Sequence, residues 1–138
     1  MKLVGFNFKK IAAEKIGDVT KNLKVNTKLD ILDIDSVDSP FFKGEEDLVK
    51  VKALYSVEYS PNIAKIELGV DILLGVEKAK TKELLESWNE KKLSEDFRLL
   101  IFNLVLKKAN VKALELEEQM NLPLHIPMPS LKKQDKKE

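Results

Sequence analysis

The sequence contains no cysteine, one histidine, His125, and one arginine, Arg98. The absence of cysteine excludes disulfide bonds, thiolate nucleophiles and cysteine-ligated zinc. A single histidine has no second histidine or thiol with which to build a metal site or activate a nucleophile, so we expect no metal and no catalytic residue. The N-terminal stretch MKLVGFNFKK lacks the long apolar run of a signal peptide. We therefore expect a soluble, cytoplasmic protein that is not an enzyme.

Neither sign of charge is in excess. The 24 Lys and Arg residues nearly balance the 23 Asp and Glu residues, which leaves a formal charge of +1. No overall field would attract nucleic acid or acidic lipid, so we expect neither partner and no membrane insertion. A chain of 138 residues, 43% of them hydrophobic, suffices for one packed domain. We assign residues 1–131 to that domain and the lysine-rich residues 132–138 to a disordered tail.

Alternation of apolar and polar residues in the first half predicts four strands. The first begins near Val4, and the second covers residues 23–31, where a change of phase predicts a bulge near Ile31. Residues 49–59 and 64–76 alternate over longer stretches, and the turn signal Ser-Pro-Asn separates them. These last two strands are expected to form a long antiparallel hairpin.

The second half has helical spacing at residues 81–89, 94–109 and 111–120. Ser94 is a plausible N-cap, followed by two acidic residues that suit the helix dipole. The expected fold class is therefore α+β, with a four-stranded antiparallel sheet covered on one face by C-terminal helices.

The helix at residues 94–109 contains the stretch FRLLIFNLVL, which is apolar on nearly all sides. A helix that covers one sheet face needs only one apolar stripe. We expect the sheet to be covered by Phe97, Leu100, Ile101, Leu104 and Val105. The remaining apolar residues of this helix are expected to pair subunits of a dimer or tetramer, and they are Leu99, Phe102 and Leu106.

Few residues in this chain suggest chemistry. The run DILDIDSVDSP carries Asp30, Asp33, Asp35 and Asp38, but it lacks the glycine and the distal glutamate of an EF-hand loop. It is interpreted as a solvated strand end and loop. Gly69 and Gly75 stand within a strand pattern with no GK[ST] sequence after them, so they predict no phosphate loop. We expect no cofactor.

Residues 121–131, NLPLHIPMPSL, form an apolar stretch with three prolines. A disordered tail would lack so much apolar surface, and the prolines forbid a regular helix or a central strand. We expect this stretch to lie extended over an apolar surface as the wall or lid of a binding groove. In this interpretation His125 is a bystander at its polar edge.

The order of these elements resembles the SecB-like chaperone family. The stretch Gly69-Val70-Asp71-Ile72-Leu73-Leu74-Gly75 is similar to the glycine-hydrophobic pattern that closes the family's fourth strand. The stretch Pro123-Leu124-His125-Ile126-Pro127-Met128 is similar to the family's proline-bearing segment, and Arg98 falls near a frequent family arginine. The resemblance covers roughly residues 3–131. It implies an oligomeric protein that holds unfolded chains in apolar grooves without nucleotide, in protein export or beside a toxin–antitoxin system.

Three functions remain open from the sequence. The first is a holdase-type chaperone for unfolded or nascent polypeptides, the second is an oligomeric adaptor with one dedicated protein partner, and the third is an enzyme acting on a small ligand. Suppression of aggregation of several unrelated clients would separate the first two, and a pocket with converging polar groups would favour the third. The residues expected to contact clients are Phe41, Phe42, Leu54, Leu73, Leu122, Leu124, Ile126 and Met128.

Overall fold

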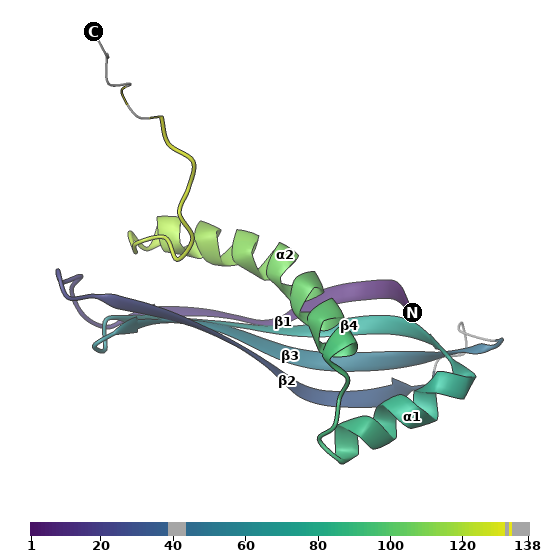
Figure 1. The fold of residues 1–138 in the computed structure, drawn as a ribbon. Helices are drawn as coiled ribbons and strands as arrows, with labels where there is room; N and C mark the ends of the chain where they lie inside the picture. The colour runs from purple at the N-terminus through teal and green to yellow at the C-terminus, as the bar shows by residue number, and fades with distance from the viewer. Residues whose placement is uncertain (39–43, 132, 134–138) are drawn as a thin grey trace, which may run out of the picture.

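A computed structural model describes residues 1–38, 44–131 and 133 of the chain. Phe41 and Phe42, which we expected to contact clients, lie outside the described residues. The elements follow in the order β1 (Lys2–Lys15), β2 (Lys24–Val37), β3 (Glu46–Ser60), β4 (Ala64–Glu77), α1 (Lys78–Asn89) and α2 (Glu95–Gln119). Figure 1 shows the strands as one twisted layer, with α2 crossing it diagonally.

The four predicted strands form one antiparallel sheet, and the structure gives their order as β1-β4-β3-β2. The turn at residues 61–63 joins β3 to β4, and its Asn62 has a left-handed backbone conformation with φ of 48°. A register shift between Ile31 and Asp33 confirms the predicted bulge in β2. The sheet therefore has two edge strands, β1 and β2.

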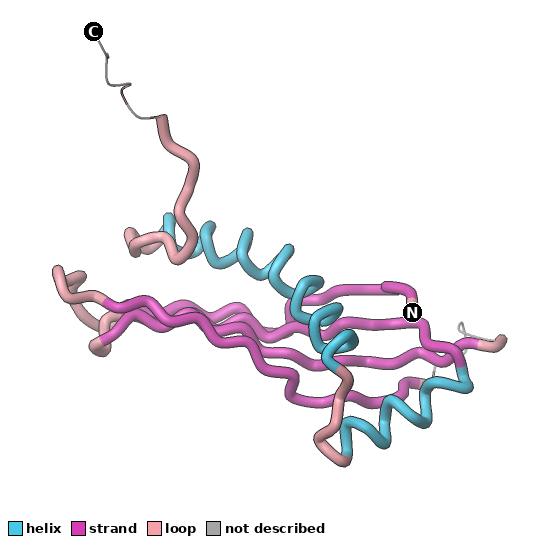
Figure 2. Tube along the Cα trace, viewed as in Figure 1, coloured by secondary structure: helices cyan, strands magenta, loops and turns pink. Residues whose placement is uncertain are grey.

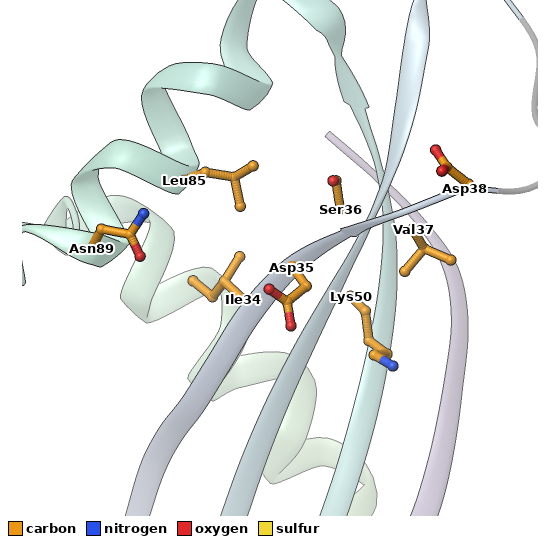
Figure 3. A pocket seen from close by; sticks show the side chains of 8 residues that line it. All are labelled: Ile34, Asp35, Ser36, Val37, Asp38, Lys50, Leu85 and Asn89. Atoms are coloured by element: carbon orange, nitrogen blue, oxygen red, sulfur yellow. The ribbon is translucent and has the colours of Figure 1, made fainter.

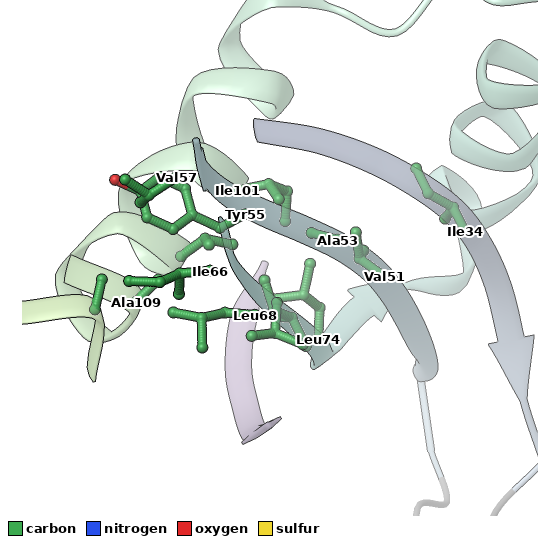
Figure 4. Packing of buried hydrophobic residues seen from close by; sticks show 14 of the residues in the cluster. Ile34, Val51, Ala53, Tyr55, Val57, Ile66, Leu68, Leu74, Ile101 and Ala109 are labelled. Atoms are coloured by element: carbon green, nitrogen blue, oxygen red, sulfur yellow. The ribbon is translucent and has the colours of Figure 1, made fainter. Parts of the chain in front are cut away.

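Within the part of the chain that the structure describes, the helices cover one face of the sheet, and Figure 2 shows them as the second layer. Alternate residues of β3 and β4, from Val49 to Tyr59 and from Ala64 to Val76, are buried on this face. Figure 4 shows how they pack with Ile101 and Ala109 of α2. The other face carries lysines, acidic residues and a few leucines. The expected α+β fold with one covered face is confirmed.

Residues of α2 are buried at intervals of four: Phe97, Ile101, Val105, Ala109, Ala113 and Glu117. The prediction that Leu100 covers the sheet is wrong, because Leu100 lies on the flank of this series and is 40% exposed. Leu104 packs only partly against the core. The two helices predicted over residues 94–120 are one helix, since Asn110 and Val111 continue the same spacing without a break.

The ends of α2 have identifiable causes. The Ser94 side chain accepts a hydrogen bond from the Phe97 backbone N–H, which confirms the predicted N-cap. At the other end, Asn121 adopts a left-handed φ of 53°, and the Leu122 N–H donates to the Glu117 carbonyl at 2.8 Å. This is a Schellman termination, which turns the chain back toward its own helix. Residues 121–131 are called the strap from here on, and their first part is directed back onto α2, with Leu122 and His125 bonded to Glu117. Residues 127–131 are exposed, and Figure 1 shows them running away from the helix and the sheet, so the expectation that the whole stretch lies over an apolar surface is wrong for these residues.

Replacement of Ala113 tests the close packing of α2 on the sheet. Ala113 has no exposed surface, so the Ala113→Leu variant must displace strand side chains and should lose about 1–3 kcal/mol of unfolding free energy in urea. Val111→Leu, at a position that is 66% exposed on the same helix, serves as the matched control and should change little. Equal stability of both variants would contradict close packing at Ala113.

Candidate functional site

A buried carboxylate lies where α2, β3 and the strap meet. Glu117 belongs to the buried series of α2 and has 0% exposed surface. Its oxygens accept hydrogen bonds from the Tyr59 hydroxyl at 2.8 Å and from the His125 backbone N–H at 3.1 Å. A buried charge is costly unless it is fully hydrogen-bonded, and this one is surrounded by donors. Glu117 therefore ties the strap to both the helix and the sheet.

His125 is part of this buried network, and the expectation that it is a bystander at a polar edge is wrong. Its side chain is 1% exposed, and Nδ1 lies 2.7 and 2.8 Å from the two carboxylate oxygens of Glu117. Since a carboxylate only accepts hydrogen bonds, Nδ1 carries the proton. Nε2 lies 3.0 Å from the side-chain oxygen of Asn110. The imidazole is thus held at Nδ1 by the Glu117 carboxylate, and it fixes the middle of the strap.

Two tyrosines of β3 complete the network from the side of the sheet. The Tyr55 hydroxyl donates to Asn110 at 2.8 Å, and the Tyr59 hydroxyl also lies 2.6 Å from the Pro123 carbonyl oxygen. Burial, with a smaller effect of the Glu117 charge, raises the pKa of Tyr55 to about 12. The pKa of Tyr59 is raised by burial and then by its contacts with Glu117. Both hydroxyls stay protonated at neutral pH and remain donors.

This network was not predicted, although the sequence contains one signal of it. Glu117 falls on the four-residue spacing that begins at Phe97, where every other member is apolar or alanine. A charged residue on an otherwise apolar stripe indicates a buried polar contact. Tyr55 and Tyr59 on the apolar face of their strand carry hydroxyls that need partners. Nothing in the sequence paired these groups with His125.

The contacts between Glu117 and His125, called the tether from here on, hold the middle of the strap. Apolar side chains of the strap lie on both sides of the tether. Leu122 is buried in the core, and Ile126 is half-buried. Leu124 and Met128 are 43% and 55% exposed. These two line an open hollow of about 370 Å³, together with Leu114, Glu115 and Glu118 of α2. The strap is held in its middle and presents exposed apolar groups beside the helix.

A strip of β2 is left partly uncovered beside α2. Val25, Leu29 and Ile31 pair with residues of β3 that lie under the helix, so their side chains face the same side of the sheet. All three are only half-buried. One flank of α2 carries Phe102, Leu106 and Asn110. The Asn110 side chain contacts Tyr55 of β3, and Tyr55 pairs with Leu29 of β2. The half-buried apolar strip thus lies between the helix flank and the free edge of the sheet.

The other expected contact and interface residues are spread over the molecule. Leu54 and Leu73 are half-buried on the face of the sheet that no helix covers. Leu54 lines an open hollow of about 560 Å³ there, beside Leu32 and several lysines. Leu99 is half-exposed on the solvent side of α2, whereas Leu106 packs partly against the core. The structure therefore does not bring all these residues to one surface.

The acidic run borders an open hollow of about 520 Å³ at the end of β2, between the strand and α1. Figure 3 shows its lining, which includes Asp35, Lys50 and Asn89. A hydrogen bond between the side-chain carboxyl groups of Asp33 and Asp35 lowers the pKa of Asp33 and raises the pKa of Asp35. Neighbouring residues of a strand point to opposite faces, so the polar groups here straddle β2 rather than converge. This geometry gives no support to the hypothesis that the protein is an enzyme acting on a small ligand.

Two further features of the described residues bear on function. None of their helices is long and apolar enough to cross a membrane. Nor do residues 1–38, 44–131 and 133 contain a group of three or more His, Asp or Glu side chains placed to hold a metal ion.

Comparisons with known proteins support the architecture. No family model and no curated protein sequence matches the chain. Among solved structures, it is similar to the SecB-like chaperone Rv1957 of Mycobacterium tuberculosis in complex with a ChAD peptide from the Rv1956 HigA1 antitoxin. The match covers 97% of this chain and 92% of that chain, with a TM-score of 0.57 and 11% sequence identity. The chain has the SecB-like fold, which confirms the predicted resemblance at the level of the fold.

Removal of the Glu117 carboxylate tests the tether. The Glu117→Ala variant leaves His125 and Tyr59 without their shared acceptor, so unfolding in urea should show a loss of about 3 kcal/mol. Limited proteolysis should also cut the strap faster than in the unmodified chain. Glu118→Ala, at the exposed neighbouring position, should change stability by less than about 0.5 kcal/mol. A strap that stays protected in Glu117→Ala would contradict a tether at this residue.

Proposed function

We propose that this chain, which has the SecB-like fold, binds non-native polypeptides and keeps them from aggregating without nucleotide or catalysis. One observation carries the proposal. The half-buried apolar strip of β2 and the exposed Leu124 and Met128 of the strap leave apolar surface open beside α2. Open apolar surface of this kind binds apolar side chains of a partner, and the free energy comes from burying both.

The tether supports this proposal because it lowers the ordering cost of binding. The strap contains Pro123, Pro127 and Pro129, whose φ angles are fixed, and its centre is held by His125. A segment that is already ordered loses less conformational entropy when a partner binds. Met128 adds an adaptable side chain that can pack on partners of different shape. These properties suit a surface that accepts many sequences.

The peptide bound to the structurally similar Rv1957 gives independent support. That protein shows that a chain of this fold can hold a polypeptide segment. The same observation favours a second candidate function, an adaptor with one dedicated protein partner, because the bound peptide comes from one antitoxin.

Light scattering separates the two candidates. Several unrelated proteins are diluted from denaturant with and without the chain, in the absence of nucleotide. General holding predicts reduced aggregation of each client at near-stoichiometric ratios. Protection of none of them, with tight binding to one partner, would favour the adaptor.

Variants of the strap test which surface does the holding. Leu124→Ser with Met128→Ser removes exposed apolar area from the strap while leaving Leu122 and His125 in place. Affinity for a permanently unfolded protein, measured by fluorescence anisotropy, should fall about tenfold, because each buried methylene contributes about 0.8 kcal/mol. Val111→Ser removes a similarly exposed apolar residue from the solvent side of α2 and should leave affinity unchanged. Equal affinity of the unmodified chain, the double variant and Val111→Ser would place the binding surface elsewhere.

We also propose that the chain forms a dimer or tetramer in which Leu99, Phe102 and Leu106 of α2 contribute to the contact. Sedimentation velocity at micromolar concentration should show an oligomer. Leu99→Glu and Phe102→Glu should shift it toward monomer, and Asn103→Glu, at an exposed position of the same helix, should not. A monomeric unmodified chain would contradict this proposal.

A further inference from the structure

The free edge of β2 provides a regular row of backbone groups. Within the described part of the chain, β2 pairs only with β3, so the opposite side of the strand has no strand beside it. Residues 24–31 run without a register shift. The other edge strand, β1, is interrupted between Leu3 and Gly5 and again between Phe8 and Lys10. Since bulges disturb the ladder, β2 offers the longer uninterrupted template for another strand.

The two faces of this edge differ in chemistry. The helix-side residues are Val25, Leu29 and Ile31, all half-buried, with the exposed Thr27 between the first two. The opposite side carries Lys24, Asn26, Lys28 and Asp30. Lys28 lies 3.9 Å from Asp30, an exposed and weak pair, and Lys24 has no ion pair among the described residues. A strand added here would meet apolar groups on one face and mainly positive charge on the other.

We propose that the 24–31 edge of β2 binds an extended client segment as a fifth strand of the sheet. The segment has apolar residues at alternate positions and acidic residues between them. Its apolar side chains extend the strip beside Val25 and Leu29, and its carboxylates lie near Lys24 and Lys28. Backbone hydrogen bonds supply affinity that does not depend on sequence, and the alternate side chains supply the preference. This inference rests on the proposed function and specifies its client.

The same lysines disfavour a second copy of this edge paired about Asn26, whereas a register about Thr27 would place Lys24 opposite Asp30. Antiparallel pairing of two β2 strands about Asn26 would place Lys24 of each copy opposite Lys28 of the other. Like charges directly opposite one another destabilise a strand pair. An acidic client strand would place opposite charges beside both lysines and a like charge beside Asp30 alone.

Two peptides test the charge preference. Both are eight residues long with valine or isoleucine at alternate positions, and one carries glutamate and the other lysine at the remaining positions. By fluorescence anisotropy at low salt, the glutamate peptide should bind at least about fourfold tighter, at roughly twofold or more per charge pair. Lys24→Glu with Lys28→Glu should reverse the preference. Lys78→Glu with Lys82→Glu, which makes the same charge change on exposed positions of α1, should leave it intact.

Amide hydrogen exchange then locates the bound peptide. At saturation with the glutamate peptide, exchange should slow in residues 24–31 of β2 and stay unchanged in residues 10–15, the uninterrupted stretch of β1. Peptide binding without protection of residues 24–31, or without a charge preference, would overturn the added strand and leave the proposed function standing. If neither peptide binds and unfolded proteins do not bind either, both proposals fail.

Discussion

The buried carboxylate of Glu117 is the constraint on which the position of the strap depends. It lies on the covered stripe of α2, and its hydrogen bonds to Tyr59 and His125 join a strand, a helix and the strap. Replacing either partner with an apolar residue would remove part of the hydrogen bonding that compensates a charge in the interior. Nearby apolar groups alone would not define one position for a segment with three prolines. The directional contacts of Glu117 specify where the strap lies.

The apolar surface of the sheet is larger than the helices can cover. The strands are 14 or 15 residues long, and α2 crosses them with alanines and aliphatic residues over β3 and β4. The edge strands therefore keep half-buried apolar residues, including Leu29 of β2 and Phe8 of β1. The helices therefore cover the centre of the sheet, and the apolar residues of the edge strands stay partly exposed. This geometry leaves a buried core beside accessible apolar surface.

Much of the fold could be predicted from local pattern, because alternation with period two directly reports a half-buried strand. The hairpin of β3 and β4, the bulge after Ile31 and the Ser94 cap follow from a few neighbouring residues each. The flank position of Leu100 and the continuity of α2 through Asn110 depend on how the helix crosses the sheet. The pairing of Glu117 with His125 depends on the chain reversal at Asn121. Contacts of this tertiary kind leave no periodic signal, so the candidate site was predicted less well than the fold.

Isothermal titration calorimetry at several temperatures tests the central claim most directly. The titrant is one protein in two forms, a permanently unfolded variant and the native protein. Burial of apolar surface between a client and the chain predicts binding of the unfolded form alone, with a negative heat-capacity change. Binding of the native form with equal affinity, or binding without a heat-capacity change, would contradict recognition of non-native polypeptides through apolar surface.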